Sequence, residues 1–344
     1  MKAFFTRIFT AIMAFWTMVF GFLFHNGSDK PEPTPEPEPT SSVVQLTERE
    51  QEMADFEAAV VGSGVFENTW QTALPQTKIY NLIRGHFTSP LPAGKTKKKV
   101  LVLGYDGCRA DLFASVATAQ NSAVRTLLDN GGHAVLSYAG GVNYPAVNTQ
   151  ATSTAPGWCS MLTGQWADVH GIYNNGVAKS NDHLTLLTTL VQDGLADSTA
   201  YYVSWDGHFI GANTTYINEK TLVETQGMPV VFSDATDDNG TKANALADLN
   251  QADCSDFIFT IFEYTDHTGH GSGFTPKNAA YMQAFHDADA TGKALLRAVE
   301  SRENYAEEDW LILITTDHGG WSTRHGGDTL EERITFIISN QAIA

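Results

Sequence analysis

The sequence predicts an α/β fold built around a mostly parallel sheet. Three apolar runs, at 100–103, 257–262 and 311–314, are rich in Val, Ile, Leu and Phe, which is typical of strands buried on both faces of a parallel sheet. A long helical segment at about 276–302 leads from the second run to the third. Each run is followed by polar residues. Because ligands bind outside the carboxyl ends of strands in open α/β sheets, we expect the functional site there.

The composition is that of a globular protein with one large domain or two small ones: 344 residues, 42% hydrophobic and 17% charged. The chain is acidic, with a formal net charge of -18 at pH 7 and a pI of about 4.9. Such a chain lacks the basic surface that binds nucleic-acid backbones, so no nucleic-acid polymer is expected as a partner. If the protein handles phosphates, bound metal ions are the obvious local cations.

The amino-terminal segment does not belong to the predicted fold. Lys2 and Arg7 precede an apolar run at 8–24, which is typical of a signal peptide or signal anchor over residues 1–25. The basic residues lie on its amino-terminal side, so we expect an extracytoplasmic protein, secreted or held at the membrane by this segment. Residues 26–45 include alternating Pro and Glu, which favours an extended spacer.

The folded part begins with a helix after Thr47. Thr47 and Glu50 have the spacing of a capping box. The next element is the strand at 100–103, which ends in Asp106, and a helix is expected to follow. An isolated Asp-Gly pair is more often a turn whose Asp caps the next helix, so Asp106 needs support from the other strand ends.

A further helix is predicted to begin near Thr154. Pro156 suits the first turn of a helix, and Gly164 suits its end. Thr154 therefore lies where backbone N–H groups and the helix dipole favour an anion. Its hydroxyl could act as a nucleophile towards phosphate if a metal lowered its pKa, although an N-cap role is commoner in general. The polar turn at 170–176 could donate amide hydrogen bonds to a phosphoryl oxygen.

The middle of the chain has a weaker pattern. Its expected elements are a helix at 184–195, a strand at 201–206, a short strand at 230–232 and a helix at 243–249.

The run at 257–262 is followed by acids and imidazoles. We interpret Asp266 and His270 as held by a tight Gly-bearing loop, at a spacing that lets both reach one metal ion. His267 is a weaker candidate, because adjacent side chains after a strand usually diverge.

The last run, at 311–314, leads into Asp317 and His318, with His325 close behind. A carboxylate and two imidazoles make half of a plausible zinc site, because Zn²⁺ binds Asp oxygen and His nitrogen. The alternative is a loop with a helix cap and two surface histidines.

Taken together and in order, these motifs resemble the alkaline phosphatase superfamily, and within it the type I phosphodiesterase/nucleotide pyrophosphatase branch. The resemblance covers roughly residues 100–338. It implies a three-layer sandwich with helices on both faces of the sheet, and one catalytic domain over residues 46–344. The matching segments are Asp106–Arg109, Thr154–Pro156, His170–Asn175, Asp266–His270, Asp317–Gly319 and His325-Gly326.

The resemblance also implies a cofactor of two Zn²⁺ ions and a small phosphate-ester substrate. Thr154 would attack phosphorus to give a phospho-threonine intermediate that water then releases. Asn175 and the amide after Thr154 would stabilise the equatorial oxygens. One ion would be held by Asp266, His270 and His325, and the other by Asp106, Asp317, His318 and the Thr154 oxygen.

Three features depart from the family pattern. The segment between His318 and His325 is short, Gly157-Trp158 replaces the usual Asn-His, and a terminal strand and helix after Ile338 are expected to be missing. A phosphomonoesterase and a membrane-associated phosphoglycerol or phosphoethanolamine transferase therefore remain alternatives. A sulfatase is disfavoured, because it needs a Cys or Ser nucleophile followed by a basic residue. A non-catalytic surface-binding module would not need the complete ligand set.

Three cysteines are an odd number for an exported chain. A disulfide between Cys108 and Cys159 and free buried thiols are both open, and Cys254 is left over in the first case.

Overall fold

The computed structural model describes residues 46–343, and Thr47–Ala344 forms one compact unit. The predicted signal or anchor segment and the Pro/Glu-rich spacer lie outside the described residues. Within the described part of the chain, no helix is both long and apolar enough to cross a membrane.

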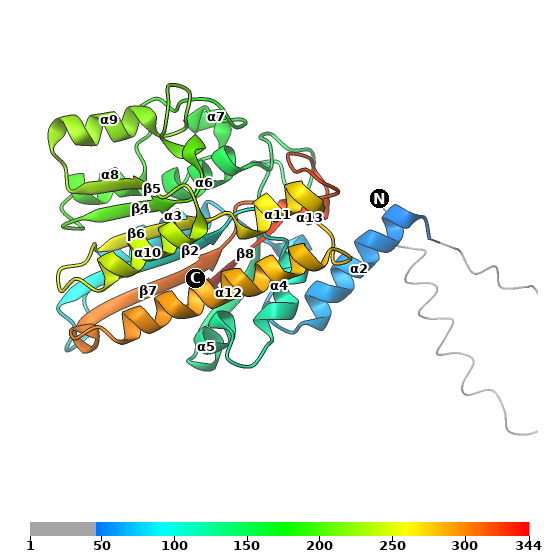
Figure 1. Cartoon of the computed structure of the whole chain (residues 1–344), viewed down its shortest axis with the longest axis horizontal. Coiled ribbons are helices and arrows are strands. Elements are labelled where there is room, and N and C mark those ends of the chain that lie inside the picture. Colours follow the sequence, from blue (N-terminus) through cyan, green and yellow to red (C-terminus); the bar gives the residue numbers. More distant parts are fainter. Residues whose placement is uncertain (1–45, 344) are drawn as a thin grey trace, which may run out of the picture. The chain divides into compact units, whose positions relative to one another are not determined.

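An eight-stranded sheet forms the centre of this unit, in the order β1-β3-β8-β7-β2-β6-β4-β5 (Figure 1). Neighbouring strands are parallel, except that β8 runs antiparallel to both β3 and β7. The three runs singled out from the sequence are adjacent strands in the middle of the sheet, with Val100 paired to Phe257 on one side and to Leu311 on the other. The strands are β1 (Leu74–Pro75), β2 (Lys97–Tyr105), β3 (His133–Tyr138), β4 (Thr199–Val203), β5 (Val230–Asp234), β6 (Phe257–Phe262), β7 (Glu308–Thr315) and β8 (Ile334–Ser339).

Helices cover both faces of the sheet, which confirms the predicted three-layer α/β sandwich (Figure 1). One apolar layer joins the sheet to α2, α4, α5, α10 and α12, and the other joins it to α3, α6, α8 and α9. Side chains alternate along β2, so Leu101 and Leu103 enter the first layer while Val100 and Val102 enter the second. The helices are α2 (Glu48–Gly62), α3 (Lys78–Thr88), α4 (Ala110–Ala117), α5 (Ala123–Asp129), α6 (Thr154–Thr163), α7 (Ala167–His170), α8 (Leu186–Gln192), α9 (Ile217–Gln226), α10 (Asp238–Leu249), α11 (Tyr264–Ser272), α12 (Ala279–Glu300) and α13 (Leu330–Arg333).

Helix starts and stops follow the local sequence. The capping box at Thr47 and Glu50 is present, with both reciprocal hydrogen bonds. Helix α6 begins at Thr154 and ends before Gly164, whose φ of 70° is left-handed and suits glycine. The predicted helix at 184–195 is shorter in the structure, because only Leu186–Gln192 is helical.

One local prediction was wrong. Asp266 and His270 do not lie in a loop, since both belong to helix α11. The glycines of this segment argue against a helix from propensity alone. Tertiary packing overrides that preference: a side chain at Gly269 would meet the ring of Phe274 at 2.4 Å.

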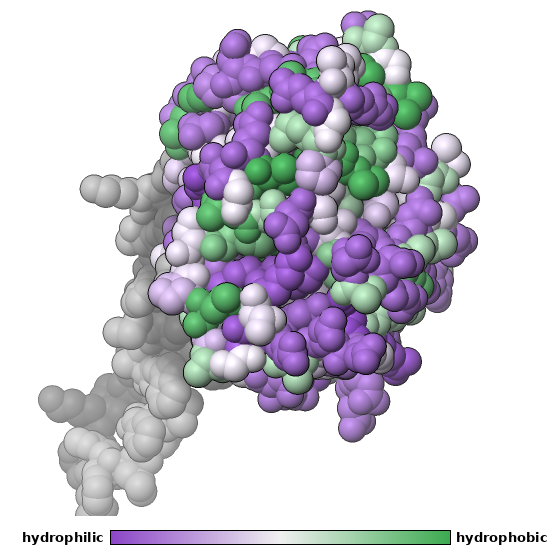
Figure 2. Space-filling view, turned by 90° about the vertical axis from the view of Figure 1, so that its left-hand side faces the viewer, coloured by the Kyte–Doolittle hydropathy of each residue, from purple (hydrophilic) through white to green (hydrophobic). Residues whose placement is uncertain are grey.

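The structure also settles the state of the cysteines and the position of the last apolar run. Cys108, Cys159 and Cys254 are all free and buried, so no disulfide links the first two. The apolar residues before Ile338 form β8 in the interior of the sheet. The end of the unit where the strands begin displays mainly hydrophilic side chains around smaller hydrophobic areas (Figure 2).

Candidate active site

The polar residues that follow the three central strands meet at one end of the sheet. Asp106 follows β2, Asp317 follows β7 after Thr316, and Asp266 lies in α11 just after β6. Because β2 lies between β6 and β7 and all three are parallel, their carboxyl ends are neighbours. Asp106 and Asp317 are completely buried, so the sheet brings carboxylates into a site from which water is largely excluded.

The first cluster contains Asp106, Asp317 and His318. The Nε2 atom of His318 lies 3.4 Å from Asp106 Oδ1 and 3.3 Å from Asp317 Oδ2. Ligand atoms of all three side chains lie within 4.8 Å of one another, which is a spacing that can hold one metal ion.

The second cluster contains Asp266, His270 and His325. Asp266 and His270 lie four residues apart in α11 and so share one face of the helix. Nε2 of His270 lies 3.4 Å from Asp266 Oδ2, and Nε2 of His325 lies 3.7 Å from Asp266 Oδ1. The ring centroids of His325 and His318 are 4.0 Å apart, so the two clusters are directly adjacent.

All three imidazoles are oriented in the same way. Nδ1 of His318 lies 2.7 Å from the carbonyl oxygen of Gly319, Nδ1 of His270 lies 3.1 Å from that of Thr323, and Nδ1 of His325 lies 3.0 Å from that of Thr152. A carbonyl oxygen can only accept, so each Nδ1 must carry the proton and donate. In the neutral ring this leaves the Nε2 lone pair free. Metal-binding histidines usually donate their other ring N–H to a carbonyl or carboxylate oxygen in this way.

Orphaned polar atoms show that the clusters fit metal ions. Asp266 Oδ1, Asp317 Oδ2 and His318 Nε2 are buried and have no hydrogen-bond partner among the described residues. Leaving such atoms unpaired is costly, whereas one divalent cation in each cluster would satisfy them. The set of carboxylate oxygens and imidazole nitrogens is one that zinc accepts.

Charge leads to the same conclusion. Burial raises the pKa of Asp317 well above its usual range, and the neighbouring Asp106 carboxylate adds to this effect. Burial also raises the pKa of Asp106. For His318, burial lowers the pKa, but the carboxylates of Asp317 and Asp106 outweigh burial and raise it to about 10. The protein groups alone therefore do not stabilise the ionised forms of both carboxylates, and a bound cation would do so.

Thr154 lies beside the first cluster. It is the first residue of α6, and its hydroxyl donates to Asp106 Oδ1 at 3.4 Å. The two preceding hydroxyls have other partners, since Ser153 Oγ lies 3.2 Å from Nδ1 of His325 and Thr152 donates to the carbonyl oxygen of Gly327. Among these three hydroxyls, Thr154 is the one that faces the first cluster.

Asn175 also reaches the start of α6. Its Oδ1 accepts a 2.9 Å hydrogen bond from the backbone N–H of Ala155, although Asn175 itself is exposed. The amide after Thr154 is therefore engaged by Asn175. The side-chain Nδ2 of Asn175 is the donor that remains for a ligand at this position.

Sequence reasoning missed two residues of the site. Trp158 is fully buried, and its Nε1 donates to Asp106 Oδ2 at 2.8 Å, which leaves Oδ1 for Thr154 and His318. Its position four residues after Thr154 in the same helix was the available signal. Glu263 lies directly after β6 and is within metal-binding distance of Asp106 and Asp266, so the strand-end rule could have found it.

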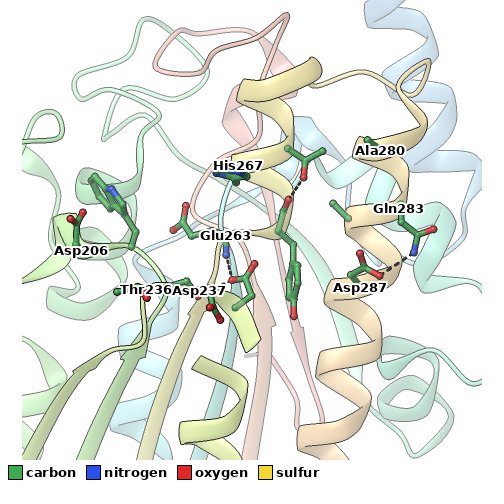
Figure 3. Close-up of a pocket in the computed structure, with 14 residues that line it drawn as sticks. Asp206, Thr236, Asp237, Glu263, His267, Ala280, Gln283 and Asp287 are labelled. Atoms are coloured by element: carbon green, nitrogen blue, oxygen red, sulfur yellow. Dashed lines mark hydrogen bonds between the residues drawn. The ribbon is translucent and has the colours of Figure 1, made fainter. Parts of the chain in front are cut away.

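An acidic cavity of about 620 Å³ borders the clusters on the Glu263 side (Figure 3). His267 lies there, beside Glu263 and outside both candidate metal clusters. Burial raises the pKa of Glu263 well above its usual range, with Asp106 as the next cause. The other acids that line the cavity are Asp206, Asp237, Asp238 and Asp287.

The fold and the order of these motifs agree with the resemblance to the alkaline phosphatase superfamily. The sequence model of the type I phosphodiesterase / nucleotide pyrophosphatase family matches residues 100–334, and the chain belongs to that family. No protein with a curated description matches the chain.

Several solved structures are similar to this chain at low sequence identity. A candidate sulfatase from Bacteroides thetaiotaomicron is 12% identical over 71% of this chain and 64% of its own, with a TM-score of 0.50. Mouse ectonucleotide pyrophosphatase/phosphodiesterase 5 is 18% identical over 64% of this chain, with a TM-score of 0.43. The zinc complex of the carboxy-terminal periplasmic domain of Escherichia coli EptC is 14% identical over 72% of this chain and 74% of its own, with a TM-score of 0.42. The match spans 57% of the length of the mouse protein.

Proposed function

We propose that the protein is an exported phosphoric ester hydrolase of the phosphodiesterase/nucleotide pyrophosphatase type, with two zinc ions and a threonine nucleophile. The observation that carries the proposal is the position of Thr154. Its hydroxyl lies at the first turn of α6 against Asp106, with the second carboxylate–imidazole cluster adjacent. Membership of the family supports the reaction class.

The two clusters supply the two sets of ligands. Asp106, Asp317 and His318, together with the Thr154 oxygen, would hold one ion, and Asp266, His270 and His325 would hold the other. When bound, a pair of divalent ions supplies positive charge to the attacking and leaving oxygens of an in-line displacement.

Thr154, Asp106 and Asn175 would have distinct roles in the reaction. The proton of Thr154 Oγ1 faces Asp106 Oδ1, so this hydroxyl is oriented to lose it. Thr154 Oγ1 forms a bond to phosphorus as the bond to the leaving oxygen breaks; the threonine is phosphorylated, and the proton from Thr154 ends on the leaving oxygen. Water then attacks phosphorus as the bond to the Thr154 oxygen breaks, a proton of the water passes to that oxygen, and the phosphate product is released. Asn175 Nδ2 holds a phosphoryl oxygen during both steps.

A substrate panel tests the reaction type. We expect zinc-loaded protein to hydrolyse bis-(p-nitrophenyl) phosphate or a nucleotide pyrophosphate faster than p-nitrophenyl phosphate, measured as kcat/KM. Faster turnover of the monoester would replace the diesterase proposal with a phosphatase. Transfer of phosphate to an added alcohol in place of water would favour the transferase alternative.

Export is the second part of the proposal and rests on the sequence of residues 1–45. A basic start, an apolar run and a Pro/Glu spacer support placement outside the cytoplasm. Protease added to intact cells should therefore degrade the folded unit, as followed by immunoblot against residues 47–344. Full protection together with recovery in the cytosol would contradict export.

A further inference from the structure

One loop sets the orientation of the imidazoles in both clusters. This segment, the ligand loop, comprises residues 319–325. Its first carbonyl, at Gly319, accepts from His318, and its Thr323 carbonyl accepts from His270. His325 is its last residue and belongs to the second cluster. A shift of this loop would therefore move or release all three candidate ligands together.

The ligand loop has few constraints of its own. Residues 322–324 are exposed, and Ser322 has a φ of 58°, a left-handed conformation that costs a non-glycine residue free energy. A bridge between Trp321 and Arg324, with N···O distances of 2.9 and 3.2 Å, closes the turn, and Phe274 donates to the Ser322 carbonyl at 2.7 Å. Contacts from outside the loop must therefore contribute to holding this conformation.

Helix α2 supplies such contacts. The indole Nε1 of Trp321 donates to Glu52 Oε2 at 3.2 Å, and the Arg49 guanidinium lies over the Trp321 ring, 5.6 Å from its centroid. Arg49 also donates two hydrogen bonds to Glu331, at 2.8 and 2.7 Å, in the bidentate geometry that fixes an Arg–carboxylate pair.

Glu331, in turn, contacts Gly319, the first residue of the ligand loop. Its side chain is almost completely buried, and its carbonyl oxygen packs so tightly on Gly319 that a Cβ there would lie 2.0 Å away. The next residue, Glu332, accepts from the Gly319 N–H at 3.0 Å. Arg49 therefore touches the loop at Trp321 and, through Glu331, at its first residue.

Few polar contacts join α2 to the ligand loop, and a cavity lies beside these contacts. A cavity of about 620 Å³ separates part of α2 from the loop, and it is lined by Phe56, Arg109, Phe274 and Trp321 among others. Apolar packing between α2 and the loop is therefore incomplete. Other packing contacts would not hold the loop in place if Arg49 or Trp321 were replaced.

We propose that Arg49 and Trp321 are positioning residues, through which α2 holds the ligand loop so that His270, His318 and His325 are oriented for metal binding. This rests on the proposed function. Helix α2 lies outside the residues 100–334 that match the family, whereas Trp321 and Glu331 lie inside them. Removal of groups that orient metal ligands typically weakens metal affinity about 10- to 100-fold.

The test compares Arg49→Ala and Trp321→Phe with a matched control on the same helix. Trp321→Phe keeps an aromatic ring beneath Arg49 but removes the N–H that donates a hydrogen bond to Glu52. The control is Glu57→Gln, because Glu57 accepts from the indole of Trp70, so the same kind of pair is altered away from the loop. The two readouts are amide hydrogen exchange of residues 319–325 in metal-free full-length protein and zinc affinity by chelator competition.

We expect Arg49→Ala to speed exchange in the ligand loop and to weaken zinc binding about tenfold or more. Trp321→Phe should do the same to a smaller extent, and Glu57→Gln should leave both readouts at the wild-type values. Unchanged exchange in both test variants would overturn the proposal. Faster exchange with unchanged zinc affinity, or an equal loss of affinity in Glu57→Gln, would also overturn it. Wild-type protein that binds no zinc would instead refute the proposed function, and the exchange comparison would still decide whether α2 holds the loop.

Discussion

Thr154→Ala should lower kcat by at least about a thousandfold, which corresponds to roughly 4 kcal/mol in the activation barrier. The substitution removes the proposed nucleophile and one proposed metal ligand at once. Ala155 and Asn175 would keep their hydrogen bond, because it uses the backbone N–H of Ala155 and not the Thr154 side chain. The loss should therefore appear in turnover measured under zinc saturation, with little change in thermal unfolding.

Two neighbouring substitutions control the assignment. Thr154→Ser should keep part of the activity, because the oxygen remains at the start of α6. Ser153→Ala should lose little, since the Ser153 hydroxyl contacts Nδ1 of His325, and that nitrogen also has the Thr152 carbonyl as a partner. Acid quenching during turnover should trap phosphate on Thr154. If Thr154→Ala stays within about tenfold of wild type while Ser153→Ala is inactive, the nucleophile is Ser153.

The sequence predicted the centre of the sheet and the placement of the acids well, for a physical reason. Strands buried on both faces appear as continuous apolar runs, and parallel strands end at the same edge. Once 100–103, 257–262 and 311–314 are assigned as neighbours, Asp106 and Asp317 must lie close together. The division of the ligands into two sets came from the family resemblance, and the structure brings the same two sets together.

Local sequence patterns failed to predict structure at positions where tertiary packing determines it. Helix α11 contains Gly269 and Gly271, so propensity favours a loop, but Gly269 is needed for the approach of the Phe274 ring. The direction of β8 was equally hidden, because an apolar run fits a parallel or an antiparallel strand.

Contacts between side chains far apart in the sequence could not be predicted from local sequence patterns. Arg49 and Glu331 are 282 residues apart, and nothing in either segment signals the other. Trp158 is an intermediate case. The sequence showed only that it replaces a usual residue, whereas the structure shows its N–H on Asp106 Oδ2. Such partners depend on how helices and strands pack, which the periodicity of a single element does not encode.

Metal dependence should be stoichiometric. Purified protein should carry close to two zinc equivalents by elemental analysis, because each cluster offers three protein ligands and buried orphaned atoms lie in both. Chelation should abolish hydrolysis, and added zinc should restore it. His270→Ala should reduce the content to about one equivalent and lower kcat at least about a hundredfold, since removal of even an indirect partner of a ligand costs about 10- to 100-fold.

Helix α11 provides the matched control for this prediction. His267 is three residues from His270 in the same helix but lines the acidic cavity and lies in neither cluster (Figure 3). His267→Ala should therefore keep two zinc equivalents and most of the activity. A parallel loss in both variants would indicate damage to α11 and not removal of a ligand. A fully active preparation without stoichiometric metal would refute the two-zinc assignment, because the buried Asp106, Asp266 and Asp317 would then work with only the neighbouring imidazoles to balance their charge.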